Sequence, residues 1–380
     1  MLLKILSIIM AVIVLLNYFI INIKAVDDDT YKQCSVLTEI ETGTVLGEKN
    51  SKVKVPVGVM NKLMTAIIVY DCIENGKIKL NDEVTVSSNA NMKQGAQIWV
   101  MPGESITIED AVKSVIIGNA NDAAAVLAEA VSGTEEKFIE LMNEKADYLG
   151  MSDTVFTNPD GYYDPYKQIS TAYDVSLLLC EMAREKIFTD YFTQKMDYVR
   201  NGETMLVNSN KLVNKYDGLV GYKFCYSKDT GYCLAAAAVR NNEGYAVVLL
   251  GYEEEDEMYA EAVRLLDKGF SQYGIVKPEI PTDCPGEVIV KNGEKNVVSL
   301  EYCETDKMVM KNGDAQKIRT YIVLPEYIEA PVCKKDKIGE VLFYKNEEYI
   351  CSVDILAREG VNKISVKSVI VKMLKFLMRF

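Results

Sequence analysis

The feature that most constrains the fold is a change of apolar pattern across a proline-rich break at residues 277–287 (KPEIPTDCPGE). Before this break, apolar residues recur at spacings of three and four in several long segments, which predicts helices. After it, short runs rich in β-branched residues alternate with turns, which predicts strands. The sequence therefore predicts an α+β domain at residues 30–273, followed by a small all-β domain at residues 277–357.

Within the first domain, strand patterns lie at both ends and helical patterns lie between them. Residues 35–50 read as a strand, a turn and a strand. Residues 232–252 form two apolar runs around a turn that contains Asn and Gly, a strong hairpin signal. Helical periodicity occupies the segments 61–73, 109–131, 135–150 and 260–274. This order predicts an antiparallel sheet covered by helices.

The N-terminus has the pattern of an export signal. Lys4 precedes a long apolar run, and the acidic residues 27–29 follow Ala25. The apolar run is nearly long enough to span a bilayer, so residues 1–25 are predicted to be either a signal peptide or an uncleaved signal anchor. Both alternatives predict an extracytoplasmic protein.

The C-terminal segment, residues 363–380, is cationic and amphipathic. At helical spacing, basic and apolar side chains fall on separate faces: Lys372, Lys375 and Arg379 on one, and Ile370, Met373, Leu374 and Leu377 on the other. A short helix of this kind is typical of segments that lie in the membrane interface. The alternative is a last helix that packs on its own domain. We expect the tail to associate with the surface of the cytoplasmic membrane.

Composition excludes several classes of site. The chain contains no histidine, which removes Ser-His-Asp and Cys-His catalysis and also His-ligated zinc and haem. Its net charge of −13 argues against a nucleic-acid partner, because phosphate binding needs clustered Lys and Arg. No cofactor is expected.

The nine cysteines include no C-x-x-C pair, which argues against a zinc or dithiol motif. Two interpretations remain for an exported chain. The cysteines are either small buried apolar residues, which their apolar neighbours favour, or disulfide partners. The best disulfide candidates are Cys284, Cys303, Cys333 and Cys351.

Three segments resemble the active-site motifs of one enzyme family. They are VPVGVMNKLMTA at residues 55–66, IIGNANDAAAVLAE at 116–129 and VGYKFCYSKDTGYCL at 220–234. In the D-alanyl-D-alanine carboxypeptidases, the corresponding motifs are S-x-x-K, S-x-N and K-T-G. The stretches at 95–112, 149–164 and 170–179 also resemble that family, and in the same order. The chain is therefore identified as a member of peptidase family S11, the low-molecular-mass penicillin-binding proteins with a β-lactamase-like transpeptidase fold.

The resemblance implies a role for each matching position. Lys62 lies at the position of the family's general base, and Val59 replaces the nucleophilic serine. Asn119 replaces the serine of S-x-N, and Asn121 matches its asparagine. Lys223 matches the lysine of the substrate-binding K-T-G strand, on which the next three residues are Phe224, Cys225 and Tyr226.

In the family, the serine attacks the peptide carbonyl of a D-alanyl-D-alanine stem and forms an acyl-enzyme. Val59 has no oxygen for this attack, and the Asn119 amide cannot pass on a proton as a hydroxyl does. Phe224 and Cys225 stand where the family has threonine and glycine. We expect the Phe224 ring to lie at the pocket, and the Cys225 side chain to hinder close approach of a substrate backbone.

These substitutions favour a catalytically inactive homologue that binds peptidoglycan stem peptides or an envelope partner. The alternative is an active D,D-carboxypeptidase with an unconventional nucleophile, for which Cys225 and Ser227 are the nearest candidates. A β-lactamase is the weakest interpretation, since it needs the same missing serine.

Overall fold

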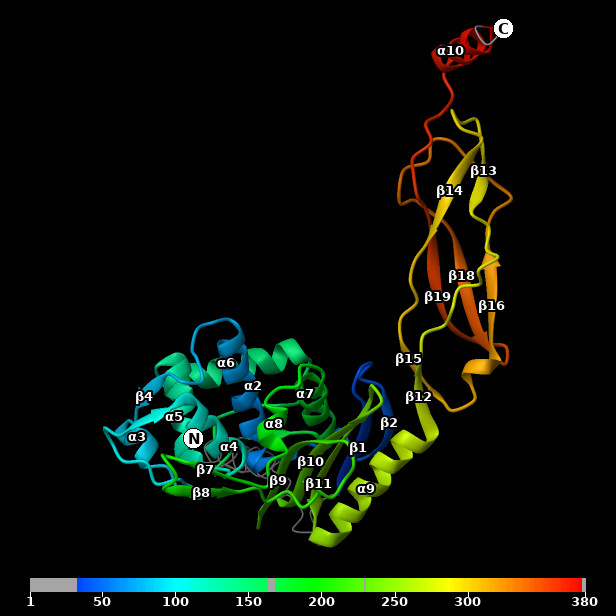
Figure 1. Cartoon of the computed structure of the whole chain (residues 1–380). Helices are drawn as coiled ribbons and strands as arrows, with labels where there is room; N and C mark the ends of the chain where they lie inside the picture. Colours follow the sequence, from blue (N-terminus) through cyan, green and yellow to red (C-terminus); the bar gives the residue numbers. More distant parts are fainter. Residues whose placement is uncertain (1–32, 163–167, 229, 378–380) are drawn as a thin grey trace, which may run out of the picture.

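The computed structural model describes residues 33–162, 168–228 and 230–377. An α+β domain and an elongated β domain are joined through α9 and β12 (Figure 1). The α+β domain is built on a five-stranded antiparallel sheet in the order β2-β1-β11-β10-β9. Its strands are β1 Cys34–Glu39, β2 Val45–Lys49, β9 Leu219–Ser227, β10 Gly231–Arg240 and β11 Glu243–Tyr252.

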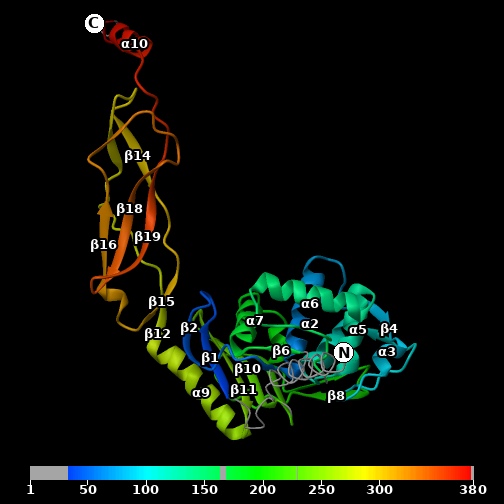
Figure 2. The same ribbon diagram turned by 180° about the vertical axis from the view of Figure 1, so that it is seen from behind.

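Helices cover both faces of this sheet. One face carries the main helical layer: α2 Asn61–Glu74, α4 Ile108–Ile116, α5 Asn121–Ser132, α6 Glu135–Leu149 and α7 Ala172–Arg184. The other face is covered by α9, Glu255–Gln272, as both views show (Figures 1 and 2). The shorter elements are η1 Gly58–Met60, α3 Ser88–Asn91, α8 Thr189–Phe192, and the strand pairs β3 Val55–Pro56 with β6 Ile169–Ser170, β4 Glu83–Thr85 with β5 Ser105–Thr107, and β7 Met196–Val199 with β8 Thr204–Val207.

The two cores follow from the period-two alternation of the strands. Along β10, Ala235 and Ala237 face the main helical layer, whereas Leu234 and Ala236 face α9. The helix α9 comes very close to the sheet at Gly269, where a Cβ atom would lie 2.7 Å from the ring of Tyr245. The expected antiparallel sheet covered by helices is therefore confirmed.

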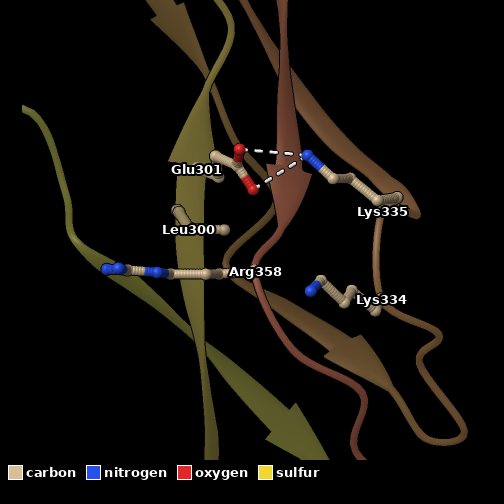
Figure 3. A pocket seen from close by; sticks show the side chains of 5 residues that line it. All are labelled: Leu300, Glu301, Lys334, Lys335 and Arg358. Atoms are coloured by element: carbon tan, nitrogen blue, oxygen red, sulfur yellow. Dashed lines mark hydrogen bonds and ion pairs between the residues drawn. The ribbon is translucent and has the colours of Figure 1, made fainter.

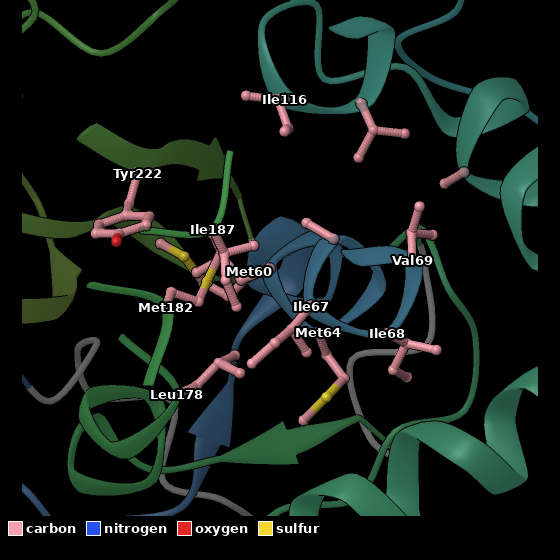
Figure 4. Packing of buried hydrophobic residues seen from close by; sticks show 14 of the residues in the cluster. Met60, Met64, Ile67, Ile68, Val69, Ile116, Leu178, Met182, Ile187 and Tyr222 are labelled. Carbon is pink, nitrogen blue, oxygen red and sulfur yellow. The ribbon is translucent and has the colours of Figure 1, made fainter. Parts of the chain in front are cut away.

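The helix α2 lies at the centre of the main helical layer. Its first nine residues, 61–69, are all buried. Figure 4 shows Met64, Ile67 and Val69 pointing outward in different directions into the surrounding core. A helix that is apolar on all sides is stable only inside a core. Any polar side chain near its start must therefore find its partners within the protein.

The predicted helix at residues 109–131 is in fact two helices. The break between α4 and α5 falls at residues 117–120, where Asn119 has a φ of 61°. Asparagine adopts this left-handed conformation more readily than most residues. The break gives α5 a free N-terminus at the position of the second motif.

The C-terminal domain is the expected small all-β unit. It contains a six-stranded sheet in the order β16-β18-β19-β14-β13-β17 around a core that includes Val298, Val341 and Phe343. Its strands are β13 Glu287–Lys291, β14 Val297–Tyr302, β16 Ile318–Val323, β17 Tyr327–Glu329, β18 Lys337–Lys345 and β19 Glu348–Ala357. The helical turn η2, Ala315–Lys317, precedes β16. At the junction of the domains, β12 Tyr273–Val276 pairs with β15 Met308–Lys311.

The last helix, α10 Val366–Leu377, lies at the far end of the β domain (Figure 1). Its apolar residues Val366, Ile370 and Met373 are exposed. Among the described residues, no helix is long and apolar enough to cross a membrane. The predicted signal segment at residues 1–25 lies outside the described residues.

All nine cysteines are thiols, so the disulfides considered among Cys284, Cys303, Cys333 and Cys351 are not formed. The favoured interpretation, that the cysteines are small buried residues, is correct for Cys34, Cys180, Cys225 and Cys233. It is wrong for Cys333, which is exposed.

Candidate functional site

Lys62 is the polar centre of the candidate site. It is the second residue of α2, and its side chain is 1% exposed. Its Nζ donates a hydrogen bond to Oδ1 of Asn121 at 2.6 Å and another to the backbone carbonyl of Asp160. The ammonium therefore joins the start of α2 to the start of α5 and to the loop at residues 158–161.

The same loop is held by the polar side chains on either side of Lys62. Asn61 Nδ2 donates to the carbonyl of Asn158 at 3.1 Å, and Thr65 Oγ1 donates to the carbonyl of Pro159 at 2.7 Å. Three successive carbonyls of the Asn-Pro-Asp-Gly segment are thus bound by α2. Sequence reasoning matched this segment to the family but assigned it no role. The role of this segment could have been inferred from Asn61 and Thr65, because polar side chains in an otherwise apolar helix start need partners within the protein.

Burial lowers the pKa of Lys62 to about 8, an effect that the nearby Asp160, Cys225 and Asp122 partly offset. Burial also raises the pKa of Asp160, and the charge of Lys62 opposes that shift. Lys62 therefore has a lowered pKa, and its ammonium is held by two hydrogen-bond acceptors, Asn121 Oδ1 and the Asp160 carbonyl.

Two residues at the start of α5 organise the neighbouring loop. Asn121 Nδ2 donates to the carbonyl of Gln94 at 2.5 Å. The buried carboxylate of Asp122 accepts hydrogen bonds from the backbone amides of Ile98 and Val100, at 3.1 and 3.3 Å. The second motif therefore fixes residues 94–100 as well as the ammonium of Lys62.

Asn119, the residue predicted to replace the motif's serine, lies just before α5. Its Oδ1 is buried and has no hydrogen-bond partner in the described part of the chain. A buried amide oxygen can accept a hydrogen bond but cannot transfer a proton as a hydroxyl does.

Lys223 lies on β9 and is also buried, with 4% of its surface exposed. Its Nζ donates to the carbonyls of Val115 and Ile116 at 2.6 and 2.8 Å. These carbonyls belong to the C-terminal end of α4, where the helix dipole favours a cation. The pKa of Lys223 lies well below its ordinary value, first because of burial and then because of the charge of Lys62, whereas Cys225 opposes the shift. The two lysines therefore act on each other and on Cys225.

The expectation that Phe224 lies at the pocket is wrong. Its ring packs on the α9 face of the sheet, stacked on Tyr259 at a centroid distance of 5.8 Å and on Tyr232 at 6.3 Å. The reason is alternation: Lys223 and Cys225 face the main helical layer, so Phe224 between them faces the other way. Tyr226 shares the side of Phe224, lies 4.4 Å from the ring of Tyr232 and is 55% exposed.

Cys225 is the strand residue that faces the lysines. It is 7% exposed and belongs to the core of the main helical layer. Ser227, the other candidate nucleophile, has its Oγ 2.9 Å from Oγ1 of Thr230 and accepts a hydrogen bond from the Thr230 amide. Ser227 is thus engaged in the turn between β9 and β10.

Val59 lies in η1, directly before α2 and three residues before Lys62. This residue is predicted from the sequence to occupy the position of the family's nucleophile, and its side chain carries no oxygen. In the described part of the chain, no cluster of His, Cys, Asp or Glu is arranged to hold a metal ion.

A separate hollow of about 370 Å³ lies in the β domain, away from all the predicted site residues. It is lined by Leu300, Glu301, Lys334, Lys335 and Arg358 (Figure 3). Lys335 forms an ion pair with Glu301 at 3.0 Å. In Figure 3 the side chains of Lys334 and Arg358 do not converge on one point, so the hollow presents no single binding geometry.

Comparison with known proteins connects this geometry to a family. Residues 22–254 match the D-alanyl-D-alanine carboxypeptidase family, and residues 281–363 match the C-terminal domain of penicillin-binding protein 5. The chain is 32% identical over 333 residues to D-alanyl-D-alanine carboxypeptidase DacF of Bacillus subtilis, covering 87% of this chain and 85% of that protein. It is 28% identical over 336 residues to D-alanyl-D-alanine carboxypeptidase DacC of Escherichia coli, covering 86% and 84%.

The fold is shared with a solved structure. Penicillin-binding protein 5 of Haemophilus influenzae superposes with a TM-score of 0.76 at 24% identity, covering 89% of this chain and 100% of that one. The α+β domain and the β domain are therefore those of a single group of proteins. The chain belongs to the D-alanyl-D-alanine carboxypeptidase family, peptidase S11.

Proposed function

We propose that this protein is a catalytically inactive member of its family that binds peptidoglycan stem peptides outside the cytoplasmic membrane. The observation that carries the proposal is the residue at the nucleophile position. Val59 precedes a fully formed Lys62 network, so the chain has the base position without a hydroxyl for the base to activate.

The hydrogen bonds of the two lysines support a structural role for both. Each buried ammonium is held by two acceptors, and each joins separate elements of the fold. A buried charge without such partners would strongly destabilise the domain. Retention of Lys62 and Lys223 is thus explained without catalysis.

The active-enzyme alternative depends on Cys225. Its side chain lies on the same face of β9 as Lys223 and interacts electrostatically with both lysines, and a thiolate is favoured by nearby cations. Cys225, however, lies on β9, the strand that matches the family's substrate-binding K-T-G segment. The family's nucleophile stands at the start of the helix that corresponds to α2. An attack from β9 would require a different substrate orientation, with its own alignment cost.

The proposed location rests on the ends of the chain. The N-terminal sequence has an export pattern, and α10 exposes Val366, Ile370 and Met373 at the far end of the β domain. We propose that this tail lies in the membrane interface.

The central test is binding without turnover. A stem pentapeptide ending in D-alanyl-D-alanine should bind the purified protein in a calorimetric titration, and no D-alanine should be released. Cys225→Leu should weaken binding because it adds bulk on the strand face that carries Lys223, whereas the matched change Cys333→Leu, in the exposed part of the β domain, should not.

Release of D-alanine, or a mass increase of one β-lactam that is lost in Cys225→Ser, would replace this proposal with the active-enzyme alternative. A folded protein that gives no binding heat would exclude stem peptides and leave an envelope protein as the ligand.

Restoring the missing hydroxyl alone should not restore activity. In Val59→Ser, Lys62 is still bound to Asn121 and to the carbonyl of Asp160, and Asn119 still offers no hydroxyl for proton transfer. We expect no turnover of the pentapeptide above the wild-type background. Val59→Ser combined with Asn119→Ser and Cys225→Gly is the set expected to recover it; Phe224 is left unchanged because its ring packs on the α9 face of the sheet.

The control for this series is Lys62→Met in the combined variant, which should abolish any recovered turnover. Robust, Lys62-dependent turnover by Val59→Ser alone would show that the cleft retains everything except the nucleophile.

Membrane association should depend on the C-terminal tail. Deletion of residues 363–380 from the leader-free protein should reduce its cosedimentation with anionic phospholipid vesicles, because the exposed apolar and basic residues of α10 are lost. The binding of stem peptide by the same variant serves as the control for folding. Equal cosedimentation with and without the tail would contradict an interfacial role for α10.

A further inference from the structure

Two buried thiols face each other beside the lysine pair. Cys225 of β9 and Cys233 of β10 are directly opposed in the antiparallel register. Directly opposed residues project from the same face of a sheet, and both cysteines belong to the core beneath the main helical layer. Sequence reasoning treated the two cysteines separately and did not pair them.

The backbone distance between such residues suits a disulfide. Opposed residues of an antiparallel pair have Cα atoms about 4.5 to 5.5 Å apart, and disulfides span about 4.4 to 6.8 Å. A hydrogen bond from the Cys225 side chain is the chief cause that lowers the pKa of Cys233, which agrees with the direct opposition of the two residues in the strand register. Little backbone movement is needed to join them.

Cys225 shares its face of β9 with the buried Lys223 and is the more exposed of the two thiols. Cys225 interacts electrostatically with both Lys62 and Lys223. A thiol attacks a disulfide in its deprotonated form. Cys233 is fully buried, whereas Cys225 retains 7% exposure. Cys225 is therefore the thiol that an external reagent meets first, and Cys233 is placed to react second.

We propose that Cys225 and Cys233 form a thiol–disulfide exchange site whose substrate is a small-molecule or peptide disulfide. The Cys225 thiolate attacks one sulfur of the external disulfide, whose S–S bond breaks and releases one thiol. The Cys233 thiolate then attacks the Cys225 sulfur, the mixed disulfide breaks, and the second thiol leaves. The two cysteines are oxidised, the external disulfide is reduced, and the protons of the cysteines end on the two released thiols.

Oxidation would change the candidate site in two ways. A disulfide sulfur cannot ionise, so Cys225 could no longer act as a negative partner of Lys62 and Lys223. The new bond would also tie β9, the edge strand of the sheet, to β10. This site does not depend on whether the cleft binds stem peptides.

The test equilibrates the folded full-length protein with reduced and oxidised glutathione, followed by acid quench, alkylation and tryptic digestion. Lys228 lies between the two cysteines, so trypsin separates them and a disulfide appears as a linked peptide pair. We expect the linked pair in oxidised buffer and its loss after reduction. Cys180→Ser is the matched control, since Cys180 is another buried thiol of the same core, with a pKa that burial raises to about 12. That variant should behave as wild type.

The order of attack is tested by the single variants. Cys233→Ser should stop at a glutathione adduct on Cys225, and Cys225→Ser should give neither adduct nor linked pair. The proposal is overturned if the folded wild type gives no linked pair under conditions that oxidise the urea-unfolded protein. It is also overturned if glutathione remains attached to Cys225 while Cys233 is present.

Discussion

The structure of the candidate site depends on one buried ammonium, that of Lys62. An ammonium inside a protein is stable only when its hydrogen bonds are satisfied, and Asn121 Oδ1 and the carbonyl of Asp160 satisfy two of them. Since the pKa of Lys62 is lowered from 10.5 to about 8, the folded state binds fewer protons than the unfolded chain between these pH values. Holding the charged Lys62 inside the folded protein therefore lowers the free energy of unfolding by about 3 kcal/mol. This loss is fully present below pH 8 and disappears as the pH rises to 10.5.

This network explains how the fold can persist with valine at residue 59. The contacts that join α2, α5 and the loop at residues 158–161 come from Asn61, Lys62, Thr65 and Asn121. The family's serine position is not among these donors and acceptors, so valine at residue 59 leaves them intact. A second lysine, Lys223, joins β9 to the end of α4 in the same way. The two buried lysines therefore hold α2, α5, α4 and β9 together around the candidate site.

The sequence predicted the parts of the structure that local pattern determines. The helix at residues 61–73, the hairpin at 232–252 and the α+β class follow from apolar period and turn residues, and the structure has them. The predictions that failed were those that depend on which face of a strand a residue occupies. Phe224 was placed at the pocket by its alignment with a family threonine, although its neighbours Lys223 and Cys225 necessarily point to the opposite face. The pairing of Cys225 with Cys233 was missed for a related reason, because it follows from the register of β9 with β10.

The most direct test of this account is the pKa of Lys62, measured by NMR titration of lysine side chains in the folded protein. We predict that one buried lysine titrates near pH 8 and is assigned by its loss in Lys62→Met. In Asn121→Ala that pKa should fall further, since the ammonium loses an acceptor, whereas Asn89→Ala on the surface should leave it unchanged. A Lys62 that titrates near 10.5, or one that does not respond to Asn121→Ala, would contradict the claim that a held, buried ammonium organises this site.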